Sequence, residues 1–107
     1  MDANGQTTVL LEIEELLNAP SDGAGAPTLA RLEDTLTEGY AQALVLEAER
    51  LRLERRLGEV AREAASPDPA EVASIGCRLT RADGELARLR GLLAPLRERR
   101  KLAAARV

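Results

Sequence analysis

The sequence has no histidine, and it has one cysteine among its 107 residues. Histidine is the commonest general base and metal ligand, and one cysteine without histidine cannot form a zinc site. Gly23 and Gly25 lack the Lys-Ser/Thr that a phosphate-binding loop requires. We therefore expect no catalytic residue, no cofactor and no metal. A small helical enzyme that works with arginine and glutamate alone is the enzymatic alternative.

Aromatic residues are almost absent, because the chain has one tyrosine, no tryptophan and no phenylalanine. Aromatic side chains supply much of the buried area of compact cores, so leucine and alanine must fill this one. A composition rich in leucine, alanine, glutamate and arginine is typical of long helices and coiled coils. The composition therefore predicts an all-α fold in one domain.

Signals for export and membrane insertion are also missing. The single Cys77 can form no internal disulfide, and no basic-then-apolar start indicates a signal peptide. The sequence contains no run of 18 apolar residues, so it predicts no membrane span. We expect a cytoplasmic protein, and the excess of arginine over lysine favours a bacterial, GC-rich source.

Proline and glycine divide the chain into three predicted helices. A short helix over about 9–18 precedes the linker of residues 19–27, and residues 1–7 are expected to be loose. The first long helix covers about 28–66, a turn covers 66–69, and the second long helix covers about 69–104. Asp68 should cap that helix, with Pro69 at its first position. Pro95 predicts a kink near 91–95.

Both long helices carry leucine-rich heptads, with steps of three and four. Two such helices of similar length, joined by a tight turn, predict a long antiparallel coiled-coil-like hairpin. The register that best matches large with small residues sets Gly39 against Leu93, Leu53 against Leu79 and Arg50 against Ala82. The predicted seam consists of Leu46, Leu53, Leu57, Val60, Val72, Ile75, Leu79, Leu86, Leu89 and Leu93.

A second, outward face on each long helix lacks the charge expected of a solvated surface. The candidate interaction face comprises Thr37, Tyr40, Ala41, Leu44, Ala48 and Leu51 on the first helix, and Ala73, Cys77, Thr80, Gly84, Ala87, Gly91 and Ala94 on the second. Each glycine inside a helix costs about 1 kcal/mol relative to alanine, so close packing by another helix is one explanation. The alternative is that the face is solvated. Cys77 lies on this face, and we expect it to be a packed small hydrophobe with no further role.

Three occupants of this face remain open: the short N-terminal helix, a second copy of the chain, or another protein. In the second case, Leu44 and Leu51 of one copy could fit the small residues of another and form a four-helix dimer. Replacing Gly84 and Gly91 by leucine should then dissociate the dimer.

Charge is distributed unevenly along the chain. Residues 1–66 carry a net charge of −7, and residues 67–107 carry +4, all of it within 97–106. Arg97, Arg99, Arg100 and Lys101 could attach to nucleic acid or anionic membrane. They could instead lie beside Glu33, Asp34 and Glu38 at the start of the first long helix. We favour the structural alternative and do not expect nucleic acid, because no aromatic residue interleaves with these bases.

These observations predict a non-enzymatic interaction module, an adaptor, scaffold or chaperone-like hairpin that associates with itself. A dimer is the favoured homo-oligomer. The protein partner and the cellular process are not encoded in any motif, and no motif assigns the chain to a known family.

Overall fold

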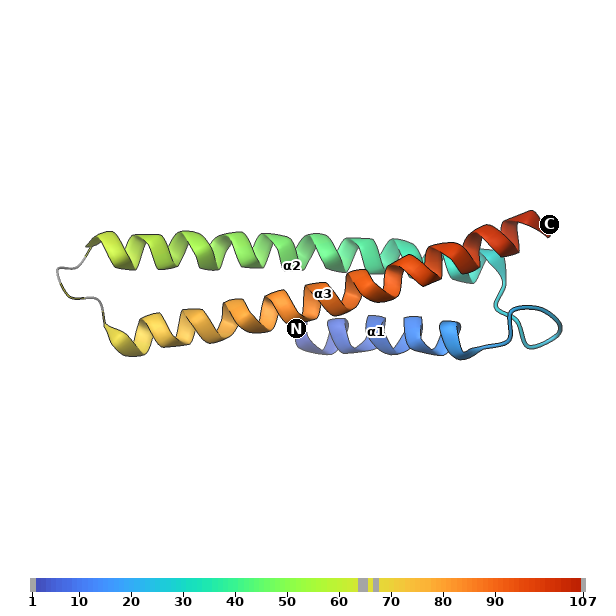
Figure 1. Ribbon diagram of the computed structural model, residues 1–107, viewed down its shortest axis with the longest axis horizontal. Helices are drawn as coiled ribbons and strands as arrows, with labels where there is room; N and C mark the ends of the chain where they lie inside the picture. Colours follow the sequence, from blue (N-terminus) through green and yellow to red (C-terminus); the bar gives the residue numbers. More distant parts are fainter. Residues whose placement is uncertain (1, 64–65, 67, 107) are drawn as a thin grey trace. The chain divides into compact units, whose positions relative to one another are not determined.

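The computed structural model describes residues 2–63, 66 and 68–106. It contains helix α1 (Asp2–Asn18), helix α2 (Leu29–Glu63) and helix α3 (Pro69–Ala105), shown in Figure 1. Helices α2 and α3 pack against each other, and α1 is the short N-terminal helix. The predicted all-helical hairpin is confirmed.

The helix boundaries differ from the prediction mainly at the start of α1. This helix begins at Asp2, whereas the apolar pattern placed its start near Val9. Helix α2 is described up to Glu63. Positions 64, 65 and 67 of the predicted helix end and turn lie outside the described residues.

Each long helix starts at a side-chain cap. Thr28 Oγ1 accepts a hydrogen bond from the amide of Arg31 at 3.1 Å, and Asp68 Oδ1 accepts one from the amide of Ala70 at 3.0 Å. Such caps satisfy amides that have no partner within the helix. The predicted roles of Asp68 as cap and Pro69 as first helical residue are confirmed.

Helix α3 is continuous through Pro95, so the proline does not end it. The kink near 91–95 stays a prediction.

The chain forms two compact units. Unit 1 combines Met1–Ala43 with Arg88–Val107, and unit 2 is Leu44–Ala87. In unit 1, all three helices contribute to the core, and Ile13 of α1 and Leu96 of α3 are fully buried. The other buried apolar residues of unit 1 are Leu16, Leu32, Leu36, Ala43, Leu89 and Leu93.

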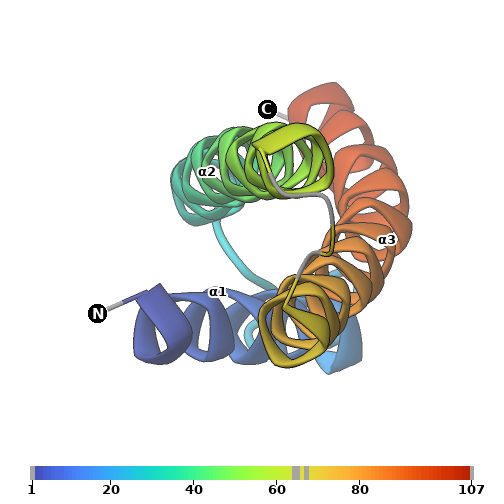
Figure 2. The same ribbon diagram turned by 90° about the vertical axis from the view of Figure 1, so that its left-hand side faces the viewer.

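Unit 2 is the part of the hairpin next to the turn, and Figure 2 looks at it from the turn end. Leu53, Val60 and Ile75 form its buried cluster, and Leu57 and Leu79 pack against them. Leu46, Ala82 and Leu86 are also buried. Nine of the ten predicted seam residues are therefore buried or half-buried. The exception is Val72, which is 36% exposed, so the first turn of α3 adds less to the seam than the heptads predict.

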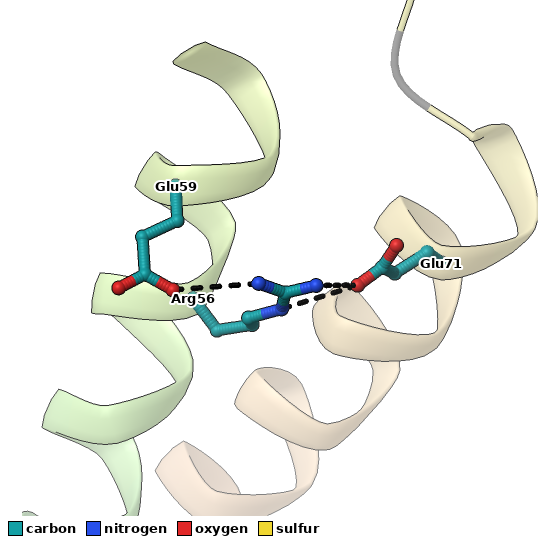
Figure 3. A network of polar contacts seen from close by, with 3 residues as sticks. All are labelled: Arg56, Glu59 and Glu71. Carbon is teal, nitrogen blue, oxygen red and sulfur yellow. Dashed lines mark hydrogen bonds and ion pairs between the residues drawn. The ribbon is translucent and has the colours of Figure 1, made fainter. Parts of the chain in front are cut away.

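Charged pairs flank the cluster of unit 2 on both helices. Arg56 donates to Glu71 across the hairpin at 2.7 Å and to Glu59 one turn along α2, as Figure 3 shows. The hydrogen bond to Glu71 raises the pKa of Arg56. These pairs are solvent-exposed, so each contributes little to stability.

Two further pairs link α2 to α3 within unit 2. Glu49 accepts hydrogen bonds from Arg52 and from Arg78, and the bond from Arg52 is the largest cause of the lowered pKa of Glu49. Arg50 lies 3.4 Å from Asp83, with its side chain 45% exposed. Arg50 is thus exposed and pairs with Asp83 of α3, and its predicted position against Ala82 stays a prediction.

Two glycines in the middle of the long helices have contrasting surroundings. A Cβ on Gly39 would lie 2.6 Å from Leu93 Cδ2, whereas a Cβ on Gly84 would meet nothing within 4 Å. Gly84→Ala is expected to raise the free energy of unfolding by about 1 kcal/mol through helix propensity. Gly39→Ala should gain less, because Leu93 is buried and must move. Urea denaturation at low protein concentration measures both, and equal shifts would contradict the close approach at Gly39.

Candidate interaction surface

The α2 outer face, defined as Thr37, Tyr40, Ala41, Leu44, Ala48 and Leu51, is exposed at every position. Leu44 is 68% exposed and Leu51 is 53% exposed. Because α2 is one unbroken helix, steps of three and four keep these residues on one side of it. Exposed leucines repeated at helical spacing are typical of a surface that another helix covers.

The α3 small-residue face, defined as Ala73, Cys77, Thr80, Gly84, Ala87, Gly91 and Ala94, is also exposed throughout. A Cβ on Gly91 would meet no described atom within 4 Å. Gly91 and Ala94, the two residues of this face that belong to the same unit as α1, are exposed, so within unit 1 helix α1 does not cover this face. Cys77 is an exposed free thiol, so the expectation that it is a packed small hydrophobe is not met within one chain.

Helix α1 packs elsewhere in unit 1. The Cδ1 atom of Ile13 lies 3.6 Å from the Cβ position of Gly39, and Glu14 accepts a hydrogen bond from Arg88 at 2.9 Å. Ile13 and Leu16 lie one helical turn apart and are fully buried. Burial of this narrow apolar stripe explains why such a short helix is stable on the hairpin.

Arg99 of α3 binds the carboxyl-terminal end of α1. Its guanidinium donates hydrogen bonds to the carbonyl oxygens of Leu16 at 3.3 Å, Leu17 at 2.5 Å and Ala19 at 3.0 Å. The last carbonyls of a helix have no partner within it and carry its partial negative charge. A positive, multiply donating side chain therefore suits this position.

The neighbouring bases also have partners within unit 1. Arg100 donates two hydrogen bonds to Glu33 Oε2, at 2.7 and 3.1 Å, and Lys101 Nζ lies 3.7 Å from Glu98. Arg106 donates to the carbonyl oxygen of Ser21. The predicted proximity of the basic segment to Glu33 is confirmed. Arg97 is exposed.

Two carboxyl groups meet where α1 packs on α2. Glu12 shares a hydrogen bond with Glu38. Partial burial raises the pKa of Glu12 most, and repulsion by Glu38 and the shared hydrogen bond raise it further, with a smaller contribution from Glu15. Arg31 lowers it. The ionised form of Glu12 is therefore disfavoured when α1 is docked.

Glu12→Gln is expected to raise the free energy of unfolding at neutral pH. A carboxyl whose pKa is raised by folding contributes stability below its ordinary pKa, and loses it as the pH rises through the raised value. The difference between variant and wild type should therefore shrink as the pH falls toward the ordinary value of 4.5. Urea denaturation at several pH values measures it.

Glu14→Gln is the matched control, because Glu14 accepts a hydrogen bond from Arg88. It should lower stability at neutral pH. The same sign for both variants would contradict the repulsion between Glu12 and Glu38.

Sites for a small ligand are poorly developed in the described part of the chain. A hollow of about 310 Å³ in unit 1 is lined by Thr28, Leu32, Arg99 and Arg106, among others, but both arginines already donate to backbone carbonyls. Residues 2–63, 66 and 68–106 hold no cluster of three carboxylate or cysteine side chains that could bind a metal. None of the described helices is long and apolar enough to cross a membrane.

Comparison with protein-family models, curated proteins and solved structures gives no match. Any function must therefore be argued from the surfaces of the hairpin. Sequence patterns did not reveal the roles of Arg99 and Arg106. Their acceptors are backbone carbonyls, which every residue has, so no residue type marks these positions.

Proposed function

We propose that this protein is a non-enzymatic interaction module, a cytoplasmic helical-hairpin adaptor or scaffold that associates with itself through its outer helix faces. The observation that carries the proposal is the exposure of Leu44 and Leu51 on the α2 outer face. The core of one chain is already formed by the buried residues of the seam and by those that pack with α1. Leu44 and Leu51 contribute nothing to that core. Covering them with another helix would remove their apolar surface from water.

The attachment of residues 97–106 to nucleic acid or anionic membrane is the less favoured function. Arg99 and Arg106 donate to backbone carbonyls, and Arg100 donates to Glu33. A phosphate would compete with these bonds for the same donors. Their use within unit 1 supports a structural role for the segment.

The mass of the full chain in solution tests the proposal. Light scattering across micromolar to millimolar concentrations is expected to give twice the chain mass of 11.5 kDa. Leu44→Glu with Leu51→Glu should restore the single-chain mass, because two buried carboxylates would oppose association. A single-chain mass of the unmodified protein at every concentration would refute self-association.

A double variant with the same change in charge serves as the control. Leu11 and Leu102 are 58% and 53% exposed and lie outside both outer faces. Leu11→Glu with Leu102→Glu should leave the association unchanged. If both double variants dissociate the protein equally, the effect is one of net charge, and the outer face is not the interface.

A further inference from the structure

The α2 outer face continues at both ends with charged residues. One heptad series runs along the helix in steps of three and four: Asp34, Thr37, Ala41, Leu44, Ala48, Leu51 and Arg55. Every one of these residues is exposed. An acid stands at the start of the series, alanine and leucine alternate in its middle, and arginine stands at its end. Glu38 and Arg52 border the series on one side, and both are also exposed.

The middle of this series, from Ala41 to Leu51, is self-complementary when read in opposite directions. In an antiparallel pair of α2 helices, Leu44 of one copy can lie against Ala48 of the second, and Ala41 against Leu51. Large residues then face small ones in each layer, which is how facing helices fill space evenly. The same register brings Glu38 of each copy beside Arg52 of the other.

We propose that two copies of this chain pair through their α2 outer faces, antiparallel, in the register that sets Leu44 against Ala48 and Glu38 against Arg52. The inference rests on the proposed self-association and names the surface responsible for it. The pairing is two-fold symmetric, so the same surface of each copy is used once and the assembly closes as a dimer.

Other pairings of the same face bring like charges together. A parallel pair would set Asp34 against Asp34 and Arg55 against Arg55. An antiparallel pair shifted by one heptad would set Leu44 against Arg55 and bring Glu38 beside Glu59. Like charges at facing positions destabilise a helix pair. The register we propose brings one like pair together, Glu47 beside Glu47 of the second copy, but it also forms two Glu38–Arg52 pairs, so charge favours it over the other two pairings.

The α3 small-residue face is a less suitable partner for these leucines. In unit 2, Leu44 and Leu51 point away from the seam residues of α2, and Cys77 and Gly84 point away from those of α3. If α2 of one copy packed on α3 of the next, an assembly of any length would still expose one α2 outer face and one α3 small-residue face at its ends. Such head-to-tail contacts continue into open chains and do not close at a dimer.

Glu38 is exposed and lies near a second carboxyl group, that of Glu12, so an added cation would be favourable there. The side chain of Arg52 is 63% exposed and uses its Nη2 atom to bind Glu49. A guanidinium has five N–H donors, so Arg52 can keep Glu49 and also donate to Glu38 of the second copy.

Charge reversal and its rescue test the pairing. Sedimentation equilibrium of the full chain should show that Arg52→Glu and Glu38→Arg each weaken dimerisation at least tenfold, about 1.4 kcal/mol. Combining Glu38→Arg with Arg52→Glu should return the dissociation constant to within about threefold of the unmodified chain, because the exchanged charges again face each other. Arg81→Glu, at an exposed position of α3, is the charge-matched control and should change nothing.

The outcomes separate this inference from the proposed function. A chain that is monomeric at all concentrations overturns both. A dimer that survives both charge reversals, or is not rescued by their combination, overturns this pairing and leaves self-association standing. A dimer dissociated by Gly84→Leu with Gly91→Leu, and insensitive to Arg52→Glu, assigns the interface to α3 instead. Circular dichroism of each variant shows whether its helices are intact.

Discussion

Arg99→Ala is expected to lower the free energy of unfolding of unit 1 by about 2 kcal/mol. The change removes a charged donor that binds three carbonyl oxygens at the end of α1. Hydrogen bonds that involve a charged group typically contribute about 1.5–3 kcal/mol. Water can reach the freed carbonyls in part, which keeps the loss at the lower end. Urea denaturation measures the loss.

The loss should be concentrated in α1. Hydrogen exchange is expected to show faster exchange for α1 amides, with little change for amides of unit 2. Lys101→Ala is the control, because the Lys101 side chain is 70% exposed and its ion pair with Glu98, at 3.7 Å, is long and solvated. Equal effects of the two variants would show that the guanidinium does not hold α1.

Leu96→Ala is expected to destabilise unit 1 more, by about 2–5 kcal/mol. Leu96 is fully buried in a core built from all three helices. Truncation removes buried apolar atoms and leaves a cavity that the surrounding helices fill only in part. Urea denaturation followed by circular dichroism gives the difference in unfolding free energy.

Leu102→Ala on the same helix provides the comparison, since Leu102 is 53% exposed. It should change stability by less than about 0.5 kcal/mol, as expected for an exposed side chain. Comparable losses in the two variants would mean that Leu96 is not buried in the folded protein.

The hairpin could be predicted because the sequence features that specify it lie within short stretches of the chain. Heptad spacing identifies the face of a helix without knowledge of its partner, and Asp68-Pro69 marks a helix start through its own backbone chemistry. Pairing small with large residues was enough to set Gly39 against Leu93. The two residues do lie against each other, since a Cβ on Gly39 would be 2.6 Å from Leu93 Cδ2.

The surroundings of α1 could not be predicted in the same way. The first seven residues carry no apolar periodicity, so nothing local placed the start of α1 at Asp2. The docking site of α1 depends on Arg99 and on backbone oxygens far away in sequence. The same limit applies to the outer faces: the sequence identifies them as uncharged, and only the structure shows that Gly91 and Ala94, in the same unit as α1, remain exposed.

The order in which the protein folds is expected to depend on which stretches of the chain make up each unit. Unit 2 is one continuous stretch, Leu44–Ala87, whereas unit 1 joins two segments that this stretch separates. A bond such as that from Arg99 to Leu16 spans 83 positions. Bringing such distant groups together is entropically costly until the intervening stretch has closed on itself. Unit 2 is therefore expected to form first during refolding, and α1 to acquire protection against exchange last.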